Sequence, residues 1–366
     1  MKRARRQKTP HISAIVPKNH FTSMSFFRES PLINWRYTST ILFTAFDVFR
    51  SSDWWLDSVI NSGLTLKEAL VELGFPKENT MIADTGIFEL EAKKAGLARE
   101  LGIDIQIELS NSQIFEAYDL SGADFFVAPD EIVFPTDGSV VARSKLNIIE
   151  ENLLELLEHV KASDVIAVLQ GIKEDNLNRL FDFYRSQGVS KFAAGGIIPL
   201  YRYNKALFRR VISYSRTLTK GYWLHTFGLP DVGLLPFYLQ TAKMDSVDTS
   251  MLLYLTAKRR FLSGVDPKPV RLALFEECEC PGCRTLNPNM YTQSDEFFIG
   301  LYIHNISEAA KVADSCRQGT WKRERSDNRI AVERSSDHSI RKGDFENRSE
   351  EQEAKWMTAY EFLNGN

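Results

Sequence analysis

Seven short apolar runs are spread along the chain, and each has the length and composition of a buried β-strand. They are TILFTAF (40–46), TMIAD (80–84), DFFVAPD (124–130), VIAVLQ (165–170), KFAAGG (191–196), YWLHTFG (222–228) and DSVDTS (245–250). Runs that are apolar at nearly every position are typical of parallel strands, because helices cover both faces of a parallel sheet. The pattern therefore predicts seven strands of one parallel sheet.

Amphipathic stretches lie between these runs and predict helices. The longest covers 145–162 and carries an apolar stripe opposite its acidic side chains: Ile149, Leu153, Leu156, Leu157 and Val160. The stretches 176–188 and 203–216 have the same character, and Gly188 is placed to end the first of them. Strands that alternate with helices in this way are typical of βα units.

Two arrangements of a parallel sheet fit this alternation, a barrel and an open doubly wound sheet. Seven strands are readable, and an eighth would close a barrel. Polar residues follow many of the strands, and in a (β/α)8 barrel all the strand ends converge on one face, where active sites are built. We therefore expect an α/β chain with a (β/α)8, TIM-type barrel, and the open doubly wound sheet is the alternative.

The polar and glycine residues at the strand ends define a candidate pocket. They are Asp84, Gly86 and Phe88; Asp130; Gln170 and Gly171; Gly195 and Gly196; Phe227 and Gly228; and Asp245 and Asp248. Taken singly, an Asp after a strand is typical of a helix N-cap, and a pair of glycines is typical of a tight turn. Together, carboxylates, an amide, open backbone N–H groups and two aromatic rings suit a flat heterocycle with several hydrogen-bonding edges.

Three cysteines and a later histidine predict a metal site. Cys278, Cys280 and Cys283 follow a C-x-C-x-x-C spacing in FEECECPGCRTL, and His304 follows in LYIHNI. Three thiolates and one imidazole fill all four positions around a tetrahedral zinc ion, which is the pattern of a structural rather than a catalytic site. Cys316 is the alternative fourth ligand. The clustering favours a bound metal in a reducing cytoplasm over a disulfide framework.

The composition is that of an ordinary globular protein. Of 366 residues, 43% are hydrophobic and 25% are charged, and the net charge is −3, so binding to nucleic acid would need a local basic face. No apolar run is long enough to span a membrane and no signal peptide is visible, so we expect a cytoplasmic protein without a membrane partner. The basic start, MKRARRQK, is interpreted either as a solvated tail or as a phosphate-contacting arm.

These patterns divide the chain into four parts. We expect an N-terminal extension over 1–35, a catalytic barrel domain over 36–270, a zinc-binding subdomain over 271–312 and a charged C-terminal tail over 313–366. The stretch WMTAYEFL near the end of the tail predicts a terminal helix.

The order of the motifs resembles that of the tRNA-guanine transglycosylase family, whose enzymes exchange a guanine base for a 7-deazaguanine. DTGIFE is similar to the family's first motif, Asp-Ser-Gly-x-Phe/Tyr-Gln, with Thr85 in place of the serine and Glu89 in place of the glutamine. The other family positions follow in order: Asp130, Gln170, Gly171, Gly195, Gly196, Ile197, Asp248, Cys278, Cys280, Cys283 and His304. The resemblance covers about residues 80 to 306.

The resemblance implies a pentosyltransferase that retains configuration through two displacements, as retaining glycosidases do. Asp248 would be the nucleophile that traps the sugar C1′ covalently. Asp84 would protonate the departing guanine and deprotonate the incoming base. Asp245 is the rival nucleophile, although alternation along a regular strand points it away from Asp248.

The remaining motif residues would hold the base. The resemblance implies that Asp130 accepts from the guanine N1–H and its amine, while Gln170 and the Gly196 N–H address the carbonyl oxygen. Phe88 and Phe227 would sandwich the ring. A base reached in this way must leave its stack, so a flipped nucleotide is implied.

The nucleic acid partner is predicted from the places where the chain departs from the family. Bacterial tRNA enzymes follow the nucleophile with a Leu-Pro-Thr-Arg segment and a Gly-rich basic loop, whereas this chain reads TSMLLYLTAKRRFL. Archaeal tRNA enzymes carry long C-terminal RNA-binding domains, and 366 residues are too few to include them. The chain thus most resembles the DNA 7-deazaguanine transglycosylases, which insert 7-cyano-7-deazaguanine (preQ0) into DNA. Lys258, Arg259 and Arg260 are either phosphate contacts or a solvated helix face.

Two other interpretations stay open. One is a tRNA-guanine transglycosylase that acts on tRNA. The other is a non-catalytic partner subunit, which would keep the zinc site and lose the carboxylates; the presence of Asp84, Asp130 and Asp248 argues against it. A second copy of the chain, or a helper protein that opens the duplex, is a further candidate partner.

Overall fold

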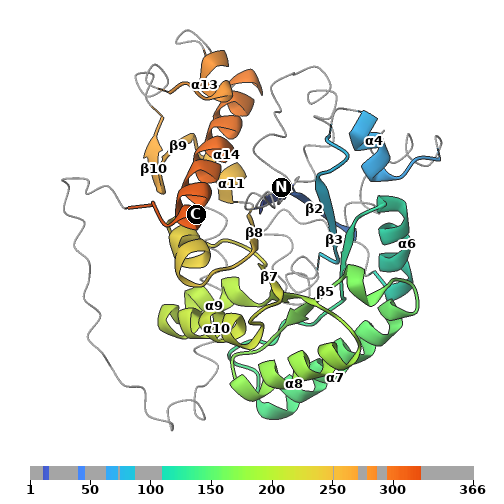
Figure 1. The fold of residues 1–366 in the computed structure, drawn as a ribbon. Helices are drawn as coiled ribbons and strands as arrows, with labels where there is room; N and C mark the ends of the chain where they lie inside the picture. Colours follow the sequence, from blue (N-terminus) through green and yellow to red (C-terminus); the bar gives the residue numbers. More distant parts are fainter. Residues whose placement is uncertain are drawn as a thin grey trace, which may run out of the picture. The chain divides into compact units, whose positions relative to one another are not determined.

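The computed structural model describes residues 11–15, 40–45, 63–72, 75–86, 109–249, 251–270, 278–286 and 295–322. Those up to Trp321 belong to one compact unit of the chain. Within it, seven parallel strands follow one another in a nearly closed barrel (Figure 1). They are β2 (Thr40–Thr44), β3 (Thr80–Asp84), β4 (Phe125–Val127), β5 (Val165–Leu169), β6 (Lys191–Ala194), β7 (Trp223–Thr226) and β8 (Ser246–Thr249).

Each of these strands lies inside one of the seven apolar runs, so the prediction of a parallel α/β barrel is confirmed at that level. The strand order follows the chain order without the reversal that an open doubly wound sheet requires. Every neighbouring pair from β2 to β8 is parallel. The carboxyl ends of the strands therefore face the same end of the barrel.

A further short strand, β1 (His11–Ile15), lies in the gap between the first and last of the seven. It pairs in parallel with both β2 and β8, and Ser13 is opposite Thr40 on one side and Asp248 on the other. This strand falls within 1–35, where the sequence predicted an extension, because HISAI is too short and too mixed to stand out as an apolar run. The complete eightfold βα repeat stays a prediction, since the chain between β1 and β2 lies outside the described residues.

Helices separate the strands as the amphipathic stretches predicted. They are α4 (Leu66–Glu72), α6 (Asn111–Ser121), α7 (Ser139–Leu157), α8 (Glu174–Ser186), α9 (Ile197–Tyr203), α10 (Lys205–Leu218) and α11 (Met251–Ala257). Short helical turns complete the connections at η3 (Ala162–Asp164), η4 (Val232–Leu234) and η5 (Phe237–Thr241). The predicted helix 145–162 is displaced toward the N-terminus in α7, because the chain turns after Leu157 to enter β5.

Alternate strand residues face two different cores. Ile166 and Val168 of β5 pack in an inner cluster with residues of the other strands, including Leu42 and Ile82. Their neighbours, such as Ala167, pack outward in a larger cluster shared with the helices. This alternation is the normal pattern of a filled barrel, and it decides which polar side chains at the strand ends turn inward.

The C-terminal elements build a smaller cluster of their own. A hairpin of β9 (Arg260–Ser263) and β10 (Asp266–Pro269) is followed by α13 (Pro281–Thr285) and the long α14 (Asp295–Gln318). Gly282 and Gly300 let α13 and α14 approach closely, since a Cβ on Gly282 would overlap the Gly300 carbonyl oxygen. Figure 1 shows α14 running beside α11 and β9, which it contacts.

The boundaries 271–312 of this part stay a prediction, because 271–277 and 287–294 lie outside the described residues. The small cluster includes Phe261 of β9, and α14 continues beyond residue 312 to pack Ala313 and Cys316 into the main core. A spacing motif marks where ligands lie but not which neighbouring elements cover them. The predicted tail from 323 onward, with its terminal helix, lies outside the described residues, as does Phe88. Among the described helices, none is both long and apolar enough to cross a membrane.

Candidate active site and metal centre

The strand-end residues gather at the carboxyl end of the barrel. Asp84 is the last residue of β3, Gln170 and Gly171 follow β5, and Gly195 and Gly196 follow β6. Asp130 comes shortly after β4, Phe227 and Gly228 come after β7, and Asp248 lies within β8. All of them except Phe88 are described, and direct contacts join several of them into two groups, one around Asp130 and one around Asp248.

The first group is a buried carboxylate and amide. Gln170 Nε2 donates to Asp130 Oδ2 over 2.6 Å, and the two residues are only 1% and 6% exposed. Gln170 Oε1 is buried without a hydrogen-bond partner among the described residues. A buried acceptor without a partner is costly unless a ligand supplies the donor. The pair can therefore offer both an acceptor and an oriented carboxylate to the edge of a polar ligand.

Two glycines leave the space that Gln170 needs. A Cβ on Gly196 would lie 2.8 Å from Gln170 Oε1, and a Cβ on Gly195 would overlap Gln170 Nε2. Gly196 also has a φ of +63°, in the left-handed region that favours glycine. The Gly-Gly turn thus has a steric role at the site beyond that of a tight turn.

The second group surrounds Asp248, which is 4% exposed. Its Oδ1 accepts from the Gly228 N–H at 2.6 Å and lies 3.2 Å from His225 Nε2. Oδ2 has no hydrogen bond to any described residue. Phe227 packs its ring edge-on to His225 at a centroid distance of 4.7 Å and borders the inner cluster. Asp248 is therefore a carboxylate with one oxygen held and the other available.

His225 is a site residue that sequence reasoning missed. It is fully buried, its Nδ1 lies 2.6 Å from Ser246 Oγ, and its ring stacks on Trp223. In HTFG, Phe227 and Gly228 were predicted as site residues and His225 was not. The period of two along β7 could have found it, because Trp223, His225 and Phe227 must share one face.

Asp245 occupies a different place from Asp248. Its Oδ2 pairs with Arg216 Nη1 at 2.9 Å and accepts from the Leu224 N–H at 2.9 Å, just before the start of β8. The carboxylate of Asp245 is thus committed to an ion pair and a backbone hydrogen bond. The two aspartates therefore have different surroundings.

Two buried tyrosines, Tyr118 and Tyr238, keep neutral hydroxyls in the electrostatic field of the carboxylates. Burial raises the pKa of Tyr118 well above its usual range, and the charges of Asp84 and Asp130 raise it further. Burial and then the charge of Asp248 act in the same way on the pKa of Tyr238. These tyrosines therefore stay protonated.

The predicted metal ligands lie together. The ligand atoms of Cys278, Cys280, Cys283 and His304 are all within 4.8 Å of one another. His304 Nδ1 is 3.5, 3.5 and 3.2 Å from the three sulfurs. A tetrahedral zinc with bonds of about 2.3 Å to sulfur and about 2.0 Å to nitrogen requires S···N separations of about 3.5 Å. The group fits a divalent metal ion.

The other ring nitrogen of His304 fixes its orientation. Nε2 lies 2.8 Å from the Leu262 carbonyl oxygen, which can only accept, so Nε2 carries the proton and Nδ1 is free to bind a metal. Phe261 stacks on the ring at 3.6 Å. Cys316 lies in the main core instead, so His304 is confirmed as the residue that completes the group.

The thiols of this group are strongly coupled. A hydrogen bond with Cys283 lowers the pKa of Cys280 to about 3, and the same hydrogen bond together with burial raises the pKa of Cys283. A bound divalent ion would displace the remaining thiol protons, because only thiolates are metal ligands.

The three basic residues after α11 have different surroundings. Lys258 and Arg260 are exposed, whereas Arg259 lies over the rings of Phe297 and Phe298. α11 begins directly after β8, so these residues stand one short helix away from Asp248. Lys258 and Arg260 are the two that remain accessible to a phosphate.

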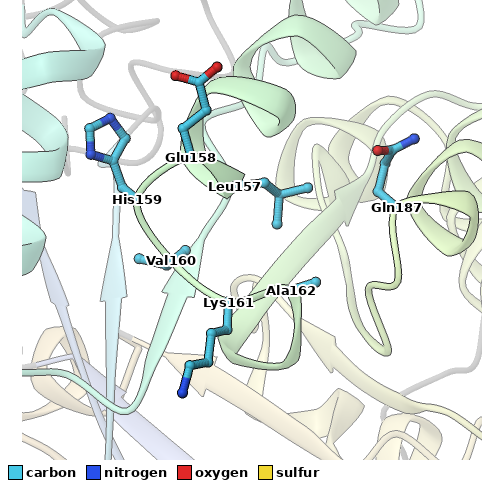
Figure 2. A pocket seen from close by; sticks show the side chains of 7 residues that line it. All are labelled: Leu157, Glu158, His159, Val160, Lys161, Ala162 and Gln187. Carbon is cyan, nitrogen blue, oxygen red and sulfur yellow. The ribbon is translucent and has the colours of Figure 1, made fainter.

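Two surface hollows lie at the opposite, amino end of the strands. One, of about 460 Å³, surrounds the turn between α7 and β5, and Figure 2 shows its lining side chains, with Gln187 across from Leu157. The other, of about 710 Å³, includes Arg216, Lys220 and Asp245. Neither includes a predicted site residue other than the rival Asp245.

The chain matches no protein-family model, and no curated protein matches it. Function must therefore be argued from the two groups at the barrel's carboxyl end and from the motifs that carry them.

Proposed function

We propose that this protein is a transglycosylase that exchanges guanine in DNA for a 7-deazaguanine such as preQ0. The observation that carries the proposal is Asp248, a buried carboxylate with one oxygen held by hydrogen bonds and the other available. A second carboxylate, Asp84, ends β3 of the same barrel and accepts from the Gly86 N–H at 3.3 Å. Two carboxylates with different surroundings suit a double displacement.

In the first displacement, an Asp248 oxygen bonds to the sugar C1′ while the bond from C1′ to guanine breaks. Asp84, as the acid, gives its proton to the departing guanine. In the second, the incoming base gives a proton to Asp84 and bonds to C1′, while the ester to Asp248 breaks. Both carboxyl groups return to their starting states, so the reaction needs no external oxidant or reductant.

Recognition of the base is assigned to the Asp130–Gln170 pair. Asp130 would accept from the guanine N1–H and amine, and the second Nε2 hydrogen of Gln170 and the Gly196 N–H would donate to the carbonyl oxygen. Gly171 and Gly195 would shape the turns on either side, and Phe227 and Phe88 would flank the ring. The buried Oε1 of Gln170 has no partner among the described residues, so an N–H of the bound nucleotide would supply its donor.

The metal group is proposed to hold zinc in a structural role. Its four protein ligands leave no open position, so the ion would stabilise α13 and α14 and take no part in the exchange. The barrel is proposed to be a complete (β/α)8, TIM-type barrel. DNA is favoured over tRNA because of the departures after Asp248, and Lys258 and Arg260 would supply phosphate contacts.

The test is incorporation of labelled guanine into guanine-containing DNA and, separately, into tRNA. We expect label in DNA, and release of that label when unlabelled preQ0 is added. Label in tRNA alone would overturn the DNA assignment. Incorporation into neither substrate would favour a non-catalytic partner subunit and would contradict the proposed activity.

A further inference from the structure

Three buried polar side chains form a hydrogen-bonded row inside the barrel. Ser246 and Asp248 come from β8, and His225 of β7 lies between them. Ser246 Oγ is 2.6 Å from His225 Nδ1, and His225 Nε2 is 3.2 Å from Asp248 Oδ1. Ser246 and His225 are fully buried and Asp248 nearly so. Strand register brings them together, since His225 and Ser246 are direct partners in the β7–β8 ladder.

Donor and acceptor chemistry fixes the direction of the hydrogen bonds in this row. An ionised carboxylate can only accept, so the hydrogen on the His225–Asp248 contact belongs to Nε2. In a neutral imidazole the other nitrogen, Nδ1, is then an acceptor, and the Ser246 hydroxyl donates to it. Every polar atom of the imidazole is satisfied with a single tautomer and without a positive charge in the barrel.

The last hydrogen bond of the row is accepted by one oxygen of Asp248, Oδ1. Oδ1 receives both the His225 contact and the Gly228 N–H at 2.6 Å, while Oδ2 receives no hydrogen bond from any described residue. Two donors on one oxygen hold the carboxylate plane in one orientation. The other oxygen keeps an unshared lone pair in a fixed direction.

We propose that His225, oriented by Ser246, is a positioning residue that clamps Oδ1 of Asp248 and so selects Oδ2 as the atom that bonds to the sugar C1′. This inference rests on the proposed transglycosylase function and adds the atom and the residues that prepare it. Preorganisation of this kind accelerates a reaction because the nucleophile does not have to be oriented during the step.

A serine–histidine–aspartate set is also known as a nucleophile triad, but the arrangement here runs the other way. Ser246 is fully buried, two residues nearer the amino end of β8, and it contacts Nδ1. In a serine-nucleophile triad the serine contacts Nε2 and the aspartate Nδ1. Asp248, and not Ser246, therefore lies nearer the carboxyl end of the barrel.

Three substitutions of His225 distinguish a hydrogen-bonding role of its ring from a packing role. His225→Gln can place an amide N–H near the Nε2 position, His225→Asn places one near Nδ1, and His225→Leu supplies none. We expect His225→Gln to keep the rate of covalent intermediate formation within about tenfold of the wild type. His225→Asn and His225→Leu should lower it about 100-fold or more, with little change in KM for DNA.

The tautomer can be read without turnover. In the protein labelled with ¹⁵N-histidine, we expect the NMR spectrum of His225 to show Nε2 protonated and Nδ1 as an acceptor, and its Nε2–H signal to shift in Asp248→Asn. Observation of the Nδ1–H tautomer would overturn the clamp whether or not the protein exchanges guanine.

The failure of the clamp and that of the proposed function give different results. If the wild type exchanges guanine and all three His225 variants match it, the clamp is wrong and the function stands. If all three lose activity equally while remaining folded, His225 acts through packing and the clamp is again wrong. If the wild type exchanges no guanine but has the expected NMR tautomer, the proposed function fails, and with it the role of Oδ2 in bond formation.

Discussion

Two buried histidines in this protein are each oriented by contacts at both ring nitrogens, but the groups that they contact differ. His225 and His304 are 0% and 2% exposed, and each has both ring nitrogens in contact with a polar atom. His304 donates to a backbone carbonyl and leaves Nδ1 to three sulfurs, whereas His225 lies between a hydroxyl and a carboxylate. The atom on the second nitrogen decides whether the ring suits a metal or orients a carboxylate.

The largest expected effect is on the metal histidine. His304→Ala should abolish stoichiometric zinc binding and lower the free energy of unfolding by several kcal/mol, because metal-binding free energy on the order of 10 kcal/mol contributes directly to folding. Metal content by mass spectrometry of the native protein and thermal unfolding would measure both. Cys316→Ala is the matched control, since that thiol is buried in the other core and should leave the zinc content unchanged.

If His304→Ala kept one zinc per chain, the four-ligand group would be wrong. If it lost zinc and retained wild-type stability, the structural role of the ion would be wrong.

The next effect separates Asp248 of β8 from Asp245, which precedes that strand. Asp248→Asn should lower the rate of base exchange about 1000-fold or more and abolish the covalent adduct, because an amide is a poor nucleophile. Asp245→Asn should leave the rate within a few-fold of the wild type and cost about 1 kcal/mol of stability through the partly exposed ion pair with Arg216. Single-turnover kinetics and denaturing gels of the adduct would measure the difference. Normal exchange by Asp248→Asn would show that the nucleophile has been misassigned.

The smallest expected effect concerns the turn after β6. Gly195→Ala places a Cβ 2.5 Å from Val168 Cγ1 and against the Gln170 amide, so it should push Gln170 away from Asp130. We expect KM for guanine to rise about tenfold while kcat changes less, since the contact binds the base throughout the reaction. Gly138→Ala is a suitable control because nothing lies within 4 Å of its Cβ position. Equal KM values for the two variants would contradict the role of Gln170.

Features with a local signal could be predicted from the sequence. The seven strands stand out because they are apolar at nearly every position, and the metal ligands stand out because three of them lie within six residues. β1 could not be located, since five residues of mixed polarity carry little pattern and its place depends on pairing with β2 and β8. The clamp on Asp248 was missed for a related reason: it depends on the register between β7 and β8, and a residue's partner across a ladder is not written in either strand alone.

α14 connects the metal group to the main core of the barrel. Near its start Phe297 and Leu301 pack in the small cluster, and nearer its end Val312 and Cys316 pack in the main core. The helix is continuous over its 24 residues and supplies side chains to both cores, so loosening of one core is expected to weaken the other. An ion that never touches a substrate would in this way set how long the barrel stays assembled around Asp248.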